Sequence, residues 1–179
     1  MTEPQAWTNP TIEGQLVLLR PFTPDDLPTA WEMITDPVGN DLTATTDEFS
    51  YDQITAWYLS RDEHADRVDL AIVERATGEF AGEVVLSDHD RSTNSCSFRI
   101  SLRGPDWFGR GLGTEATALI VRHGLDELGL ARITLEVLAR NPRAVRTYEK
   151  VGFVRTAEVV EDGEAWIHMA ITSPASALT

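Results

Sequence analysis

The stretch Trp107-Phe108-Gly109-Arg110-Gly111-Leu112-Gly113-Thr114-Glu115 is the part of this chain that decides its fold. It stands between a strand-like run and a helical run, and its three glycines at alternate positions let the backbone approach a ligand closely. The helix that follows offers free N–H groups and the positive end of its dipole, which together make an anion site. A diphosphate would fit there, although glycine loops also serve as plain turns.

Two other phosphate-binding motifs match this loop poorly. No Gly-Lys-Ser/Thr follows at the spacing of a nucleotide-triphosphate P-loop. The glycines are spaced Gly-x-Gly-x-Gly rather than Gly-x-Gly-x-x-Gly, and residues 103–106 separate the loop from its strand, which weakens a dinucleotide fingerprint. A dinucleotide oxidoreductase is therefore a disfavoured alternative.

On the N-terminal side of the loop, the pattern predicts two helices and four strands. Thr23-Pro24-Asp25-Asp26 and Ser50-Tyr51-Asp52-Gln53 each have the residues of a helix start, with a hydroxyl cap followed by acids or a capping-box glutamine. Short runs separated by turn residues indicate an antiparallel meander. The expected elements are a strand at 16–20, helices at 23–34 and 50–59, and strands at 68–75, 80–86 and 95–102.

On the C-terminal side, helices and strands alternate. We expect a helix at 114–128, a strand at 133–138, a helix at 141–152, and strands at 154–160 and 165–171. The whole order is β-α-α-β-β-β-α-β-α-β-β, which predicts a mixed α/β sheet. We expect one domain over 1–179 with an ordered core at about 12–172, and frayed tails at 1–14 and 173–179.

The composition restricts the classes of partner. Asp and Glu number 29 against 15 Lys and Arg, and the formal charge of −14 disfavours nucleic acid and anionic membranes as partners. Such a surface would suit a cationic amine, although plain solubility is the simpler explanation of the charge. No apolar run is long enough for a membrane span or a signal peptide, so a cytoplasmic location is the default expectation. Cys96 has no partner for a disulfide, and four scattered histidines predict no metal site.

A second motif, Glu136-Val137-Leu138-Ala139-Arg140-Asn141-Pro142-Arg143-Ala144-Val145-Arg146-Thr147-Tyr148-Glu149-Lys150-Val151-Gly152-Phe153, makes a family resemblance specific. Asn followed seven residues later by Tyr, and then by Glu-Lys-x-Gly-Phe, resembles a signature of the GNAT acetyltransferases. The glycine loop resembles their pyrophosphate motif, Gln/Arg-x-x-Gly-x-Gly/Ala, with Phe108 where Gln or Arg is common. The sequence of residues 107–111 resembles that of the Rim-type branch, which acetylates ribosomal protein N-termini and includes many small-amine enzymes.

This resemblance implies a fold and an activity. The fold would be the GNAT fold, a central, mostly antiparallel sheet with a βαβα coenzyme-binding half and flanking helices. The activity would be transfer of acetyl from acetyl-CoA, as cosubstrate, to a small amine or a protein N-terminus by direct attack on the thioester. Homodimers are common in the family. The alternative is a catalytically idle module on the same fold that binds or senses coenzyme A.

The resemblance also implies which residues bind the coenzyme. The amides of the glycine loop would hold the diphosphate. The end of the third strand of the meander would pair with the pantetheine amides as an added strand does. Nearby arginines would either reach the coenzyme phosphates or be plainly solvated. Asn141 would contact the pantetheine arm, cap its helix, or do both. The expected set is Ile100, Ser101, Leu102, Phe108, Gly109, Arg110, Gly111, Leu112, Gly113, Thr114, Asn141 and Arg146, with Arg143 as a further arginine.

Three residues are candidates for the chemistry. The family's matching tyrosine lies near the sulfur, so Tyr148 would donate a proton to the departing thiolate; the alternative is an aromatic packed under the sheet. Glu136 matches the proposed base of Rim-type enzymes, although Leu138 replaces the arginine of their Glu-Val-Arg run. Glu83 is the second strand carboxylate expected on the acceptor side. A chain of water molecules without any single base is the remaining option.

Overall fold

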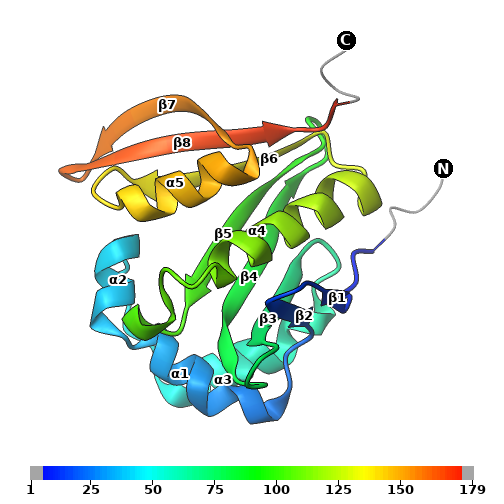
Figure 1. Ribbon diagram of the computed structural model, residues 1–179, viewed down its shortest axis with the longest axis vertical. Coiled ribbons are helices and arrows are strands. Elements are labelled where there is room, and N and C mark those ends of the chain that lie inside the picture. Colours follow the sequence, from blue (N-terminus) through cyan, green and yellow to red (C-terminus); the bar gives the residue numbers. More distant parts are fainter. Residues whose placement is uncertain (1–5, 175–179) are drawn as a thin grey trace.

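The computed structural model describes residues 6–174, in which eight strands form one sheet in the order β1-β2-β3-β4-β5-β6-β8-β7 (Figure 1). Neighbouring strands are antiparallel except β5 and β6, which are parallel. The expected mixed, mostly antiparallel sheet is thus confirmed. The strands are β1 (Ile12–Glu13), β2 (Val17–Arg20), β3 (Val68–Glu74), β4 (Phe80–Asp90), β5 (Ser95–Leu102), β6 (Arg132–Leu138), β7 (Val154–Glu161) and β8 (Glu164–Thr172).

Five α-helices accompany the sheet within residues 6–174, and both predicted helix starts on the N-terminal side are present. Ser50 and Gln53 form a reciprocal capping box at 2.8 and 3.2 Å, and Thr23 and Asp26 form another. The expected helix at 114–128 is divided into an α-helix followed by a π-helical turn at 123–127. The helices are α1 (Leu27–Ile34), α2 (Pro37–Thr43), α3 (Tyr51–Ser60), α4 (Leu112–Arg122) and α5 (Pro142–Val151).

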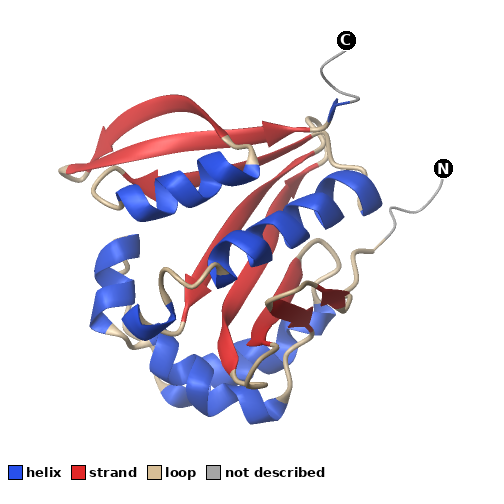
Figure 2. Ribbon diagram, viewed as in Figure 1, coloured by secondary structure: helices blue, strands red, loops and turns tan. Residues whose placement is uncertain are grey.

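Helices cover both faces of the sheet (Figure 2). α4 and α5 lie on one face, over a large core that includes Ile72, Val84 and Ile133, all fully buried. α1 and α3 lie on the other face, where Tyr58 and Phe80 belong to a smaller core. Within residues 6–174, no helix combines the length and the apolar character that crossing a membrane requires.

The N-terminal segment is better ordered than expected. Residues 6–14 were assigned to a frayed tail, but the Trp7 amide donates to the Ala65 carbonyl at 2.8 Å and its ring lies 4.7 Å from that of His89. Asn9 accepts a hydrogen bond from the Asp69 amide at 2.9 Å. The remainder of the expected tails, residues 1–5 and 175–179, lies outside the described residues.

The parallel pairing of β5 with β6 is short, and the point where it ends determines where the candidate site lies. β5 and β6 pair only over residues 95–97 and 132–134. β5 continues along β4 until Leu102 faces Gly82, and β6 continues along β8 until Leu138 faces Trp166. The two strands therefore separate after Ser97 and Thr134, as Figure 1 shows. We refer to this gap between residues 98–102 of β5 and 135–138 of β6 as the strand opening.

Candidate active site

The glycine loop ends at the first turn of α4 and leaves a run of donors free. Gly109 and Gly111 have φ values of +69° and +82°, a region that disfavours other residues, and Gly111 is the N-cap of α4. The first paired amide of the helix is that of Glu115, which donates to the Gly111 carbonyl at 3.1 Å. Among residues 6–174, the amides of 109–114 have no hydrogen-bond acceptor. Six consecutive donors at a helix N-terminus suit an anionic ligand.

A carboxylate fixes this helix start in place. Glu115, in the first turn of α4, accepts hydrogen bonds from the amides of Gln15, Leu16 and Val17 at 2.9, 2.7 and 2.8 Å. Three bonds to one ionised group hold the loop against the turn between β1 and β2. The local sequence marks Glu115 only as an acid near a helix N-terminus, which does not predict these three bonds.

The loop lies directly beside the free part of β5. A Cβ atom added at Gly113 would meet the terminal methyls of Leu102 and Ile100 at 3.5 and 3.9 Å. On its other side β5 lies close to β4, because a Cβ at Gly82 would collide with the Ser101 carbonyl oxygen. Beyond Ser97, β5 has no partner strand on the side of β6. Its backbone there can accept an extended ligand, as a sheet edge accepts a strand.

Tyr148 stands at the strand opening. It lies on α5, half-buried, with its ring 5.9 Å from that of Phe98, the first β5 residue beyond the parallel pairing. Its ring is also 6.1 Å from that of Phe153. Burial raises the pKa of Tyr148 to about 12, although the charge of Arg143 acts in the opposite direction. The phenol therefore keeps its proton throughout the neutral range, as a proton donor must.

Asn141 has the capping role that the sequence left open beside a ligand contact. It is 9% exposed, and its side chain accepts from the Ala144 amide at 3.3 Å at the N-terminus of α5. Pro142 occupies the first helical position, where a missing N–H costs nothing. The cap fixes the start of the helix that carries Tyr148.

The arginines near the loop fall into two groups. Arg110 forms an ion pair with Glu74 and lies 4.9 Å over the Trp107 ring, so its guanidinium is already engaged at the end of β3. Arg143 lies 3.5 Å over the ring of Phe108, which joins α5 to the glycine loop. Within residues 6–174, neither Arg143 nor the exposed Arg146 has a carboxylate within 4.0 Å.

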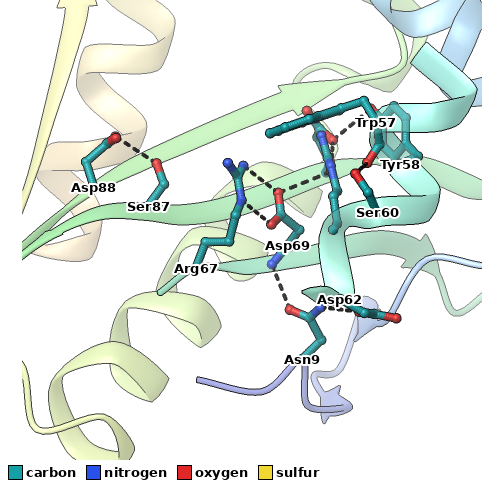
Figure 3. Close-up of polar contacts among 11 residues, drawn as sticks. Asn9, Trp57, Tyr58, Ser60, Asp62, Arg67, Asp69, Ser87 and Asp88 are labelled. Atoms are coloured by element: carbon teal, nitrogen blue, oxygen red, sulfur yellow. Dashed lines mark hydrogen bonds and ion pairs between the residues drawn. The ribbon is translucent and has the colours of Figure 1, made fainter. Parts of the chain in front are cut away.

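Glu83 lies in a closed, buried cluster on the face covered by α3. Its Oε2 accepts hydrogen bonds from the Tyr58 hydroxyl and from Nη1 of Arg61, each at 2.8 Å. The same Arg61 nitrogen lies 3.3 Å from Asp69, which also binds Arg67, and Figure 3 shows Tyr58, Arg67 and Asp69. Burial opposes ionisation of Glu83, but the charges of Arg61 and Arg99 outweigh it and lower the pKa of this carboxyl.

Glu136 lies on an exposed part of the sheet. Although β6 is a central strand, the Glu136 side chain is 64% exposed. Its strand neighbours Leu135 and Val137 belong to the core under α4 and α5, so Glu136 points to the opposite face. There its Oε1 lies 3.7 Å from Nε2 of His168.

Most of the expected coenzyme-binding residues thus lie together in the structure, whereas the three expected catalytic residues lie in different places. The loop at 108–114, the free edge at 100–102 and Tyr148 surround the strand opening on the side of α4 and α5. Glu136 borders the opening from the opposite face, whereas Glu83 is enclosed beneath α3. Phe98, Glu115 and His168 were missed, because their relevance depends on strand pairing that no local pattern reveals. Residues 6–174 hold no group of three or more His, Cys, Asp or Glu arranged for a metal ion.

Comparison with known families and sequences gives a consistent result. Residues 17–154 match the model of the acetyltransferase (GNAT) domain. The chain is 23% identical over 178 residues to mouse alpha/beta-tubulin-N-acetyltransferase 9, which spans 93% of this chain and 73% of the relative. It is 30% identical over 102 residues to spermidine N(1)-acetyltransferase of Escherichia coli K12, a match over 56% of this chain and 54% of that enzyme.

Solved structures share the fold. The structure of spermidine N-acetyltransferase from Vibrio cholerae, in complex with CoA and spermine, superposes with a TM-score of 0.82 at 20% identity. That match covers 93% of this chain and all of the other. A GNAT-family acetyltransferase from Bacillus anthracis superposes with a TM-score of 0.78 at 17% identity, over 90% of this chain and 98% of the other.

Proposed function

Because this chain belongs to the GNAT acetyltransferase family, we propose that it transfers acetyl from acetyl-CoA to a primary amine, and that its acceptor is a small polycationic amine. The observation that supports this most strongly is the strand opening, flanked by six unpaired loop amides and by Tyr148. These features would supply a diphosphate site, an edge for an amide-containing arm and a proton donor within one continuous region.

The amides of 109–114 would bind the diphosphate of the coenzyme, with Arg143 and Arg146 adding positive charge nearby. The pantetheine arm would lie along residues 98–102 of β5, which lack a strand neighbour on that side. Arg110 would contribute its backbone amide rather than its side chain, because Glu74 already holds the guanidinium. This arrangement would bring the thioester to the strand opening.

Tyr148 would act as the acid of the reaction. The amine nitrogen forms a bond to the acetyl carbonyl carbon, the carbon–sulfur bond breaks, and the phenol gives its proton to the departing thiolate. Glu136 is the better candidate for the base, since it is exposed on the face opposite Tyr148. Glu83 is a poor base, because Arg61 and Tyr58 occupy its oxygen and its pKa is lowered.

The acceptor class follows from charge and from relatives. Residues 36–66, which include α2 and α3, contain eight acidic residues and one arginine. Such a segment favours an acceptor with several positive charges, and spermidine enzymes are among the relatives. A peptide N-terminus is the second candidate for the acceptor, because the sequence of residues 107–111 resembles that of the Rim-type branch.

Release of free thiol from acetyl-CoA tests this proposal. Purified protein should release thiol with spermidine or spermine at a rate at least tenfold above that with a monoamine or an N-terminal peptide. Faster turnover with peptides would replace the polyamine by the second candidate. Binding of acetyl-CoA without turnover on any amine would instead support the idle coenzyme-binding module.

A further inference from the structure

A histidine outside the expected site lies beside Glu136. His168 on β8 and Glu136 on β6 are direct cross-strand partners, so their side chains leave the sheet on the same face. The His168 Nε2 and Glu136 Oε1 atoms are 3.7 Å apart, and the side chains are 36% and 64% exposed. Both groups are therefore accessible to a ligand and to water.

The position of this pair matters because of the strand opening. Glu136 is two residues beyond Thr134, the last β6 residue that pairs with β5. Tyr148 meets the opening from the side of α5, through its contact with Phe98. A thioester in the opening would thus have a phenol on one face of the sheet and a carboxylate with an imidazole on the other.

We infer that Glu136 and His168 form a proton-accepting pair for the attacking amine, an inference that rests on the function proposed above. Glu136 takes one N–H proton as the carbon–nitrogen bond forms and the carbon–sulfur bond breaks. His168 positions the carboxylate and passes this proton to water. The thiolate receives its proton from Tyr148, which recovers one from solvent. The step therefore releases no net proton when counted from the neutral amine, and an ammonium acceptor releases one proton before the attack.

Few other charged groups face this pair. On β5, Arg99 leaves the sheet on the same side, because its neighbour Phe98 belongs to the core under α4. From α2, Asp41 is bound by Arg140 at 2.9 Å. Arg140 also binds Glu164 at 3.1 Å.

The two remaining neighbours add no free charge. Glu83 lies on the same face and is neutralised by Arg61. β7 places Ala157 opposite His168. Within residues 6–174, His168 is the only histidine with a carboxylate within 4.0 Å.

This pairing has a consequence for the pH profile. Histidine is the side chain whose charge changes between about pH 5 and 8. A protonated His168 would form an ion pair with Glu136 and make the carboxylate a weaker base. The acid side of the kcat/KM profile for the amine should therefore change when the histidine is removed. The ionisation of the amine itself lies higher and affects every variant equally.

Substitutions at the two positions separate the roles. His168→Gln keeps an N–H donor but has no ionisable ring, so the fall of kcat/KM on the acid side should be smaller in this variant than in the unsubstituted protein. Glu136→Gln should lower kcat at every pH by at least about tenfold, with acetyl-CoA affinity unchanged by calorimetry. Glu136→Asp, which keeps a carboxylate, should recover part of that loss.

His89→Gln is the matched control, because His89 contacts Trp7 rather than the strand opening, and it should keep the unsubstituted profile. A His168→Gln profile that superposes on that of the unsubstituted protein would overturn the role of the histidine. Unchanged kcat in Glu136→Gln would overturn the pair. If the unsubstituted protein turns over acetyl-CoA and either variant gives its contradicting result, the proton-accepting pair is wrong and the proposed function stands. Absence of turnover would refute the proposed function and the pair together.

Discussion

At the scale of single residues, Tyr148 has the most clearly defined chemical environment. Its ring is enclosed by Phe98 and Phe153, and this burial raises its pKa to about 12. A phenol with that pKa stays protonated under assay conditions. A free thiol has a pKa of only about 8.5, so the proton has to be transferred while the carbon–sulfur bond breaks rather than afterwards. Aromatic packing and proton donation are therefore compatible roles for this side chain.

Tyr148→Phe tests the donor role. The substitution keeps the ring and removes the hydroxyl, so kcat should fall at least about tenfold while the Kd for acetyl-CoA changes less than about twofold. Tyr51→Phe, at the exposed start of α3, is the control and should change neither quantity. Steady-state rates and calorimetry measure both. Normal turnover in Tyr148→Phe would remove the phenol from the chemistry.

Residue identities and their roles could be predicted to different extents. The sequence indicated that Asn141 is a helix cap because Pro follows it. It indicated that Tyr148 is a candidate acid because it lies seven residues after Asn141. The environment of Glu83 was not predictable, since Tyr58 and Arg61 come from a helix more than 20 residues earlier and meet it only in the folded sheet. The position of Glu136 beside His168 was likewise not predictable, since the two residues meet only through the pairing of β6 with β8.

At the scale of elements, α3 is held to the sheet by buried charges. Arg61, just after α3, is 4% exposed and lies between Glu83 and Asp69, and its guanidinium is 3.9 Å over the Tyr58 ring. A buried arginine that loses a partner is left with an uncompensated charge, which costs about 3–5 kcal/mol. The cluster thus links α3 to β3 and β4.

Glu83→Gln should therefore lower the free energy of unfolding at pH 7 by about 3 kcal/mol, as measured by urea denaturation. Glu63→Gln, an exposed position near the end of the same helix, is the control and should change it by less than about 0.5 kcal/mol. A loss at Glu83 as small as that at Glu63 would show that the ion pair does not hold α3.

The ion pair of Glu83 with Arg61 should also make the stability of the protein depend on pH. Because the pKa of Glu83 is lowered from its ordinary value of 4.5, its ionised form contributes stability above that value, and the contribution is lost as the pH falls through the lower folded pKa. The difference in stability between Glu83→Gln and the unsubstituted protein should be full at pH 6 and shrink below about pH 4. A difference that stays constant down to pH 3 would contradict the ionised assignment.

The elements themselves show what sequence patterns can and cannot specify. Regular alternation and turn residues predicted β5 with its observed ends, and a capping box predicted α3. α2 was missed, because seven residues with a glycine and no buried side chain have no apolar periodicity, although Asp36 caps it by accepting from the Gly39 amide at 2.7 Å. The strand opening depends on where a parallel pairing stops, and the only local sign was the Gly104-Pro105 break after β5.

At the scale of the whole molecule, negative charge and the coenzyme region are separated. Arg143 and Arg146, which have no carboxylate within 4.0 Å among residues 6–174, lie on α5 near the glycine loop. The acidic segment at 36–66 includes α2 and α3, and α3 covers the opposite face of the sheet. An anionic coenzyme and a cationic acceptor would therefore each approach a face of favourable charge.

Ionic strength tests this separation. Raising NaCl from about 20 to 500 mM shortens the range of electrostatic attraction several-fold, so kcat/KM for a triamine should fall at least about fivefold. For a monoamine of similar basicity the fall should be less than about twofold. Initial rates at saturating acetyl-CoA measure both. Equal salt dependence for the two amines would show that the acidic segment does not attract the acceptor.

The central claim is that the loop amides at 109–114 and the free edge of β5 bind acetyl-CoA. Isothermal titration calorimetry tests it most directly, because it requires neither a known acceptor nor a catalytic residue. We predict one acetyl-CoA per chain with a Kd in the micromolar range, weakened at least tenfold in Gly111→Ala, where φ is +82° and a side chain is strained. No heat of binding at millimolar acetyl-CoA, with folded protein, would contradict the account.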